Sequence, residues 1–152
     1  MLLAVAGSSA GNEICGGVAN GPVVGFTSTR TLSEIAAAPF ELRLNGLGSF
    51  GGNKPRAIFA GFAPSEGLAA LRRANERAAR KAGLPPEGRN FQPHVTLARL
   101  RGSRADAVAA YLERQGRIEA EPFTVNRFVL YSSRASVGGG PYVLEAAYPL
   151  GT

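Results

Sequence analysis

A short sequence pattern occurs twice in this chain, and it constrains the fold more than any other feature. Residues 39–42 (PFEL) resemble residues 122–125 (PFTV) at an offset of 83, and glycine runs precede both Pro55 and Pro141 at an offset of 86. A capped helix is expected before each match and a strand after it. The repetition predicts two copies of one β-α-β-β unit. We therefore expect an α/β (α+β) fold of two similar lobes with a central groove.

The first copy is shorter than the second. In the second copy 65 residues separate Ala57 from Pro122, whereas only 38 residues precede Pro39 in the first. The first copy is therefore about 27 residues short. We expect the first lobe to be incomplete.

The chain is expected to form one domain with an unusual start. It has 152 residues, of which 45% are hydrophobic and 18% charged, enough apolar material for a core. Residues 1–29 contain one charged side chain, Glu13, and six glycines, whereas charges recur from Arg30 onward. We predict that residues 1–30 form an atypical, poorly packed segment and that residues 31–152 form the folded domain.

Capping and periodicity predict the individual elements. A capping box at residues 31–34 predicts a short helix that ends before Pro39, and Ser65 is expected to cap a longer helix. Ser103, with Asp106 three residues later, is expected to begin another helix that Gly116 ends. Strands are expected at residues 40–44, 57–62, 93–100, 123–131 and 142–148, with a glycine-rich connector at residues 46–52.

Two residue types are nearly absent, which excludes several kinds of site. Cys15 is the only cysteine and His94 the only histidine, so an internal disulfide, a structural zinc site and a cluster of nitrogen ligands are excluded. We expect chemistry without a metal or cofactor. No apolar run approaches the ~18 residues of a membrane span, and the N-terminus lacks the cationic segment of a secretory signal. We expect a cytoplasmic monomer that does not bind membranes.

The charge of the chain favours an anionic partner. The net charge is +6, and most of the cations are arginines, whose planar guanidinium suits phosphate. RNA is a plausible partner on these grounds. Solvated, arginine-rich helix faces would produce the same balance.

His94 and Thr96 form the strongest candidate site. They are two residues apart on an expected strand, so an imidazole and a hydroxyl project from one face, where they could hold a phosphate and move a proton. A packed, structural histidine is the alternative. By alternation Arg99 lies on the opposite face, and it is a candidate substrate-binding residue at the groove mouth or else a solvated side chain.

Three other features have simpler explanations. Residues 46–51 spell GxGxxG, but a strand is expected after them instead of the helix that a dinucleotide site requires. A strand connector explains them better. Tyr131 could stack on a base, although core packing suffices, and Cys15 has no nearby base that would make it a nucleophile.

Several segments resemble one known family. Residues 91–99 (FQPHVTLAR), preceded by residues 82–86 (AGLPP), resemble the second HxTx motif of the two-histidine (2H) phosphoesterases. The subgroup to which they are similar is the bacterial RNA 2',3'-cyclic phosphodiesterases, formerly called 2'-5' RNA ligases. The similarity extends over roughly residues 31–150 and includes residues 39–44, 46–51 and 128–133. It implies a bilobal α/β fold in which two HxTx motifs face each other across a groove, without metal.

This resemblance implies a reaction and roles for two residues. The family hydrolyses an RNA 2',3'-cyclic phosphate end to a 2'-phosphomonoester, with His94 corresponding to the proton acceptor and Thr96 to a phosphate ligand. RNA ends or nucleotide 2',3'-cyclic phosphates are the implied partners.

The sequence departs from the family at its start. It has no first HxTx motif, whose histidine would donate the proton, and we expect residues 1–30 to hold no counterpart of the family's leading strand and helix. We therefore expect impaired turnover, because losing one acid-base group costs about 10²- to 10⁴-fold in rate. A non-catalytic RNA-end or nucleotide-binding module is one alternative, and a truncated or frame-altered family member is another.

Overall fold

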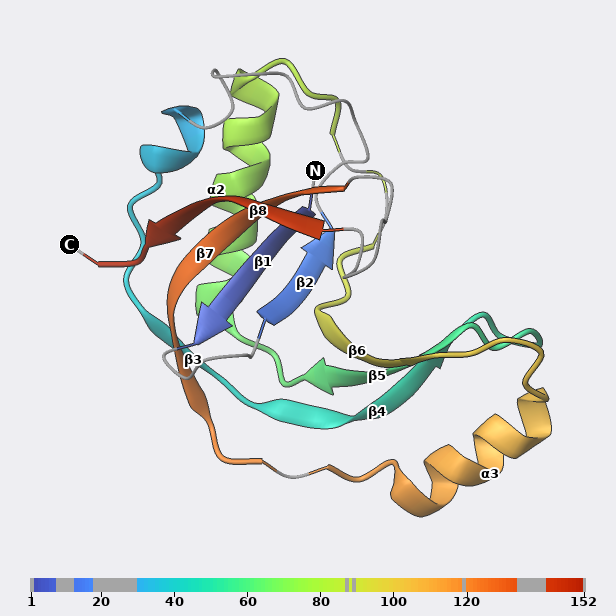
Figure 1. The fold of residues 1–152 in the computed structure, drawn as a ribbon. Coiled ribbons are helices and arrows are strands. Elements are labelled where there is room, and N and C mark those ends of the chain that lie inside the picture. Colours follow the sequence, from blue (N-terminus) through green and yellow to red (C-terminus); the bar gives the residue numbers. More distant parts are fainter. Residues whose placement is uncertain are drawn as a thin grey trace.

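The protein combines helices and strands, as expected for an α+β fold (Figure 1). The computed structural model describes residues 2–7, 13–17, 30–86, 88, 90–118, 120–133 and 142–151. Within these ranges the strands are β1 (Leu2–Gly7), β2 (Glu13–Gly17), β3 (Phe40–Leu42), β4 (Leu44–Phe50), β5 (Ala57–Phe62), β6 (His94–Arg99), β7 (Phe123–Ser133) and β8 (Tyr142–Pro149). The helices are α2 (Glu66–Lys81) and α3 (Ala105–Gln115), and residues 30–33 form a helical turn. No helix in these ranges is long and apolar enough to cross a membrane.

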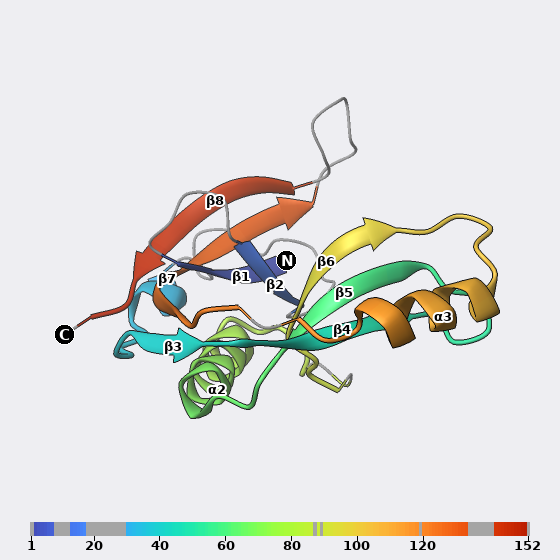
Figure 2. The same ribbon diagram turned by 90° about the horizontal axis from the view of Figure 1, so that it is seen from below.

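All the described strands belong to one antiparallel sheet with two halves. The order is β3-β7-β1-β2-β6-β5-β4, with β8 also paired to β7. The half containing β7 meets the half containing β5 through one register pair, Cys15 with His94. In Figure 2 the two halves extend in different directions from this junction, and α3 lies beside β4 at the far end.

The register reproduces the sequence repeat. Glu41 of β3 pairs with Thr124 of β7, its own equivalent at the offset of 83, and the pairs on either side are related in the same way. Reciprocal pairing of this kind is what a local twofold axis through the Glu41–Thr124 pair produces. The prediction of two equivalent units is confirmed at this position.

The N-terminal strands complete the first half of the sheet. β1 lies between β7 and β2, in the same way that β5 lies between β4 and β6. The expectation that residues 1–30 hold no counterpart of a leading strand is therefore wrong. A strand that has neighbouring strands on both sides does not need to alternate apolar and polar residues. The sequence of β1 therefore lacks the alternation from which strands are predicted. Residues 8–12, between β1 and β2, lie outside the described residues. The division of the chain at residue 30 stays a prediction.

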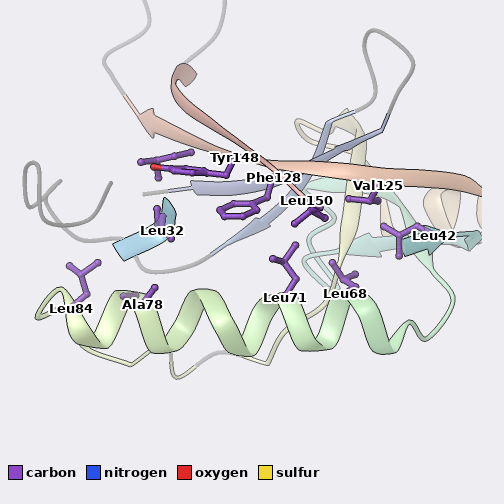
Figure 3. Close-up of a cluster of buried hydrophobic side chains, with 12 residues drawn as sticks. Leu32, Leu42, Leu68, Leu71, Ala78, Leu84, Val125, Phe128, Tyr148 and Leu150 are labelled. Carbon is purple, nitrogen blue, oxygen red and sulfur yellow. The ribbon is translucent and has the colours of Figure 1, made fainter. Parts of the chain in front are cut away.

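The main core lies between α2 and the sheet (Figure 3). Leu68 and Leu71 of α2 point from the helix toward the sheet, where Phe128 of β7 is fully buried and stacks on Tyr148 of β8 with ring centroids 4.8 Å apart. Burying each such apolar side chain contributes about 1.5–3 kcal/mol. The Ser65 side chain accepts a hydrogen bond from the Leu68 amide at 3.3 Å, which confirms the predicted helix cap.

Two predicted helix starts differ from the structure. Residues 30–33 are already helical, and the Ser33 hydroxyl donates to the Arg30 carbonyl, so the pattern at residues 31–34 does not open a helix toward Pro39. At α3 the N-cap residue is Arg104, which makes no side-chain cap hydrogen bond and instead pairs with Asp106. At α3 the Asp106 carboxylate, on which the prediction relied, forms an ion pair with Arg104.

The glycine-rich residues 46–52 were expected to form a connector, but most of them belong to β4. Only Gly51 and Gly52, whose φ angles are 111° and 52°, form the turn into β5. Gly48 lies under the Phe59 ring, where a Cβ would come within 2.5 Å of a ring carbon. The glycine therefore serves close packing within the sheet. The next element is the strand β5 and not a helix, as the sequence predicted.

Candidate functional site

His94 begins β6 and packs against two phenylalanine rings. Its ring centroid lies 4.8 Å from that of Phe50 and 5.5 Å from that of Phe59, in edge-to-face arrangements. The two phenylalanines are stacked on each other at 4.2 Å. These contacts restrict the rotation of the imidazole, which is half-buried. Sequence reasoning did not identify either phenylalanine as part of the site.

One backbone contact decides which ring nitrogen of His94 can accept a proton. Nδ1 lies 2.8 Å from the carbonyl oxygen of Gln92. A carbonyl oxygen only accepts hydrogen bonds, so Nδ1 carries the hydrogen and donates it. In the neutral imidazole Nε2 then holds the free lone pair. The geometry thus leaves Nε2 as the nitrogen available to a ligand.

Thr96 shares the sheet face of His94, as the sequence predicted. His94 pairs with Gly61 and Thr96 with Phe59, and residues directly opposite each other in an antiparallel pair lie on the same face. The edge contact between the Phe59 and His94 rings agrees with this placement. Thr96 is exposed, so its hydroxyl is open to a ligand on the face that it shares with His94.

A β-bulge brings Arg99 to the same face. The β5–β6 register shifts between Ile58 and Phe59, where one extra residue of β6 is inserted. Arg99 consequently pairs with Ala57, which alternates with Phe59 and lies on its face. The expectation that Arg99 faces away from His94 is therefore wrong, because simple alternation does not hold across a bulge. His94, Thr96 and Arg99 form one row along β6.

Repeat and register together locate the position in the first half that corresponds to His94. Leu47 and Leu130 are equivalent residues of the two copies, because they are 83 positions apart. Leu47 pairs with Ala60 of β5. Leu130 pairs with Leu3 of β1. Leu3 is therefore the structural equivalent of Ala60. This assignment rests on backbone pairing alone.

The next pairs carry the same correspondence into β2 and β6. Ala60 pairs with Val95 and Leu3 with Gly16, so Gly16 corresponds to Val95. The residues on either side follow: Cys15 corresponds to His94, and Gly17 corresponds to Thr96. The pairing of Cys15 with His94 themselves agrees with a twofold axis between them. In the chain described here, the position that would complete a symmetric pair of HxT motifs holds neither an imidazole nor a hydroxyl.

The charge around the site is positive. No Asp or Glu occurs in the strands β4, β5 and β6 or in the turn between β4 and β5 (residues 44–62 and 94–101). The same segments carry four exposed cations: Lys54, Arg56, Arg99 and Arg101.

The described residues contain no group of three or more His, Cys, Asp or Glu side chains close enough to hold a metal ion. Tyr131 is buried, so its predicted role in packing is confirmed.

Comparisons with known protein sequences agree on one family. The family model described as LigT like Phosphoesterase matches residues 62–142, more than half of the chain. The RNA 2',3'-cyclic phosphodiesterase of Aeropyrum pernix is 34% identical over 105 residues, which are 67% of this chain and 60% of that protein. The protein of the same name from Aquifex aeolicus is 30% identical over 129 residues, covering 80% of this chain and 68% of the relative. The chain thus spans about three fifths of the first relative.

Solved structures share the fold. A crystal structure of E. coli LigT complexed with 3'-AMP superposes with a TM-score of 0.62 at 21% identity, covering 82% of this chain and 67% of that one. The protein TT0787 of Thermus thermophilus superposes with a TM-score of 0.63 at 24% identity, covering 90% of this chain and 78% of that one. At these identities the likeness concerns the fold.

Proposed function

Because this chain belongs to the LigT-like phosphoesterase family, we propose that it hydrolyses RNA 2',3'-cyclic phosphate ends to 2'-phosphomonoesters, slowly and with a single histidine. The name shared by its relatives supports the substrate class. The observation that carries the proposal is the hydrogen bond from His94 Nδ1 to the Gln92 carbonyl, which leaves Nε2 as a proton acceptor beside the Thr96 hydroxyl.

The proposed reaction is an attack by water on the cyclic phosphate. The water oxygen bonds to phosphorus while its proton passes to Nε2 of His94, and the bond between phosphorus and the 3'-oxygen breaks. The Thr96 hydroxyl donates a hydrogen bond to a phosphate oxygen, where negative charge accumulates. The leaving 3'-oxygen takes its proton from solvent, and a 2'-phosphomonoester remains. His94 then returns its proton to solvent.

Proton supply to the leaving oxygen limits this scheme. A second, protonated imidazole would perform that step, but the equivalent position in β2 is Cys15. Losing one partner of an acid-base pair typically costs about 10²- to 10⁴-fold in rate. The proposed enzyme is therefore slow by the same order.

A single-turnover assay tests this function. An RNA oligonucleotide ending in a 2',3'-cyclic phosphate is incubated with excess protein from pH 5 to 9, and the 2'-phosphate product is quantified. A mechanism with a base and no acid predicts a rate that increases with pH and then levels off, without a decrease at high pH. His94→Ala should reduce it to the uncatalysed level, and Thr96→Val should reduce it by about 10-fold or more.

Other outcomes would contradict particular parts of the scheme. A rate unchanged by His94→Ala would exclude His94 as the base. A bell-shaped pH profile would mean that a second group of this chain supplies the acid. Matching thermal denaturation curves for the variants and the wild type serve as the folding control.

A second candidate function is binding without turnover. The absence of an imidazole at the β2 position equivalent to His94 favours it. In that case the protein would bind RNA ends carrying a terminal phosphate through His94 and Thr96, and the single-turnover assay would detect no product while binding remained measurable.

A further inference from the structure

Arg72 of α2 contacts the segment that precedes β6. Its guanidinium carbon lies 4.7 Å from the centroid of the Phe91 ring, within the ~6 Å at which a cation is attracted to the face of an aromatic ring. Phe91 is half-buried and packs against the main core between α2 and the sheet. Arg72 is also half-buried, and it follows Leu71, which is 1% exposed. Both partners of this contact are therefore attached to the main core.

The segment from Phe91 to Pro93 carries the group that orients His94. These three residues belong to no helix or strand, so their position depends on the contacts of their side chains. The Gln92 side chain is exposed, whereas its backbone carbonyl accepts the hydrogen bond from His94 Nδ1. Pro93 restricts the backbone conformation of Gln92 from one side. From the other side Phe91 fixes it, through Arg72 and the core.

The Gln92 carbonyl has an effect on the imidazole that the neighbouring rings do not have. Phe50 and Phe59 contact the His94 ring edge to face and so restrict its plane. A phenyl ring offers no carbonyl acceptor, so it does not determine which nitrogen carries the hydrogen. That choice depends on the position of the carbonyl. A displacement of Gln92 by about 1 Å would lengthen the 2.8 Å contact beyond the range of a hydrogen bond.

We propose that Arg72 is a positioning residue for His94. Arg72 fixes Phe91, and Phe91 fixes the Gln92 carbonyl that keeps the hydrogen of the neutral imidazole on Nδ1. The consequence for catalysis rests on the proposed function, in which the free Nε2 accepts the proton from water. The orientation of the imidazole can be measured without that function.

Nuclear magnetic resonance of the His94 ring tests this proposal. His94 is the only histidine in the chain, so protein labelled with isotopic histidine gives the signals of one imidazole. The chemical shifts of the two ring nitrogens report the populations of the neutral tautomers, once the pH is high enough that the shifts no longer change. The wild type is expected to hold mainly the tautomer with hydrogen on Nδ1. Arg72→Met should lower the ratio of this tautomer to the other by about 2- to 10-fold, the equilibrium equivalent of one hydrogen bond.

Conservative variants separate positioning from stability. Arg72→Lys keeps a cation that can lie above the ring and should restore most of the wild-type ratio. Phe91→Leu keeps an apolar side chain but removes the ring, so it should lower the ratio as Arg72→Met does, whereas Phe91→Tyr should preserve it. The spectra are recorded well below the melting temperature of each variant. A loss of stability alone would then leave the tautomer ratio of the folded protein unchanged.

Arg73→Met is the matched control. Arg73 is the next residue of α2, and its guanidinium pairs with Glu66 at 2.7 Å. Its replacement removes the same charge from the same helix, so the variant should retain the wild-type ratio. If Arg72→Met and Arg73→Met change the ratio equally, or if neither changes it, the inference is wrong.

Hydrolysis separates this inference from the proposed function. The single-turnover rate should fall in proportion to the fraction of imidazole whose Nε2 is free. A changed tautomer ratio in Arg72→Met with an unchanged rate would overturn the proposed role of His94 as the base and would support the positioning role of Arg72. Hydrolysis that requires His94, combined with a tautomer ratio that Arg72→Met does not alter, would overturn the inference alone.

Discussion

At the scale of single residues, the site depends on what surrounds His94. The Gln92 carbonyl holds one nitrogen of the imidazole, and the stack of Phe50 and Phe59 packs against its ring. Gly48 makes that stack possible by leaving room for the Phe59 ring. A glycine outside the HxT motif thus helps to position the imidazole.

Gly48→Ala should therefore destabilise the protein and disturb the site. The new Cβ would lie 2.5 Å from a carbon of the Phe59 ring, which is 7% exposed and has little room to move. Overpacking of this kind costs about 1–3 kcal/mol, measurable by urea denaturation. Gly88→Ala is the control, since nothing lies within 4 Å of its added Cβ. Equal stability of the two variants would contradict the packing role assigned to Gly48.

At the scale of elements, a surface ion pair joins the segment after the helical turn at residues 30–33 to α2. Lys81 Nζ donates to Glu34 Oε2 at 2.8 Å, and the two residues are 47 positions apart in the chain. The hydrogen bond and the charge of Lys81 hold the pKa of Glu34 below its ordinary value of 4.5. Both side chains are largely exposed, so solvent screens the pair and its contribution is small.

The stabilisation from Glu34 should disappear in acid. A carboxylate whose pKa is lowered by folding stabilises the folded state above its ordinary pKa of 4.5, and this contribution is lost as the pH falls below that value. Glu34→Gln is expected to lower the melting temperature at pH 7 by a few degrees at most, and to have no effect near pH 3. Thermal denaturation at the two pH values measures this. Glu113→Gln on α3 controls for the loss of an exposed carboxylate, and an equal effect of both substitutions would exclude the ion pair as the cause.

At the scale of the whole molecule, the two halves of the sheet are related by a local twofold axis but carry different residues at equivalent positions. The axis relates the Glu41–Thr124 pair at one side of the sheet and the Cys15–His94 pair at the other. The first half has strands in the places of β4 to β6, yet it lacks the imidazole and the hydroxyl of the second half. The slow reaction that we propose follows from this asymmetry.

Replacing both equivalent residues should supply the missing acid. Cys15→His combined with Gly17→Thr places an HxT pattern at the β2 positions that correspond to His94 and Thr96. We expect single-turnover hydrolysis of a 2',3'-cyclic phosphate to accelerate by about 10²-fold or more and its pH profile to become bell-shaped. Cys15→Ser with Gly17→Thr is the control without an imidazole. No acceleration in a variant that melts like the wild type would show that the correspondence between β2 and β6 is wrong.

Much of this protein is determined by local sequence patterns. The Ser65 cap of α2, the strand that carries His94 and Thr96 on one face, and the equivalence of residues 40–42 and 123–125 follow from capping, alternation and repetition, and the structure has each of them. These signals are readable because each depends on residues close together in the chain. The family resemblance depended on the same segments.

The tertiary structure decided the rest. The bulge that turns Arg99 toward His94 exists only because β6 is paired to β5 in a shifted register, and neither strand encodes it alone. β1 and β2 lack polar alternation, and their place became evident only through pairing with β7 and β6. The correspondence of Cys15 with His94 likewise depends on register between distant segments, which lies beyond the short range over which side-chain periodicity acts.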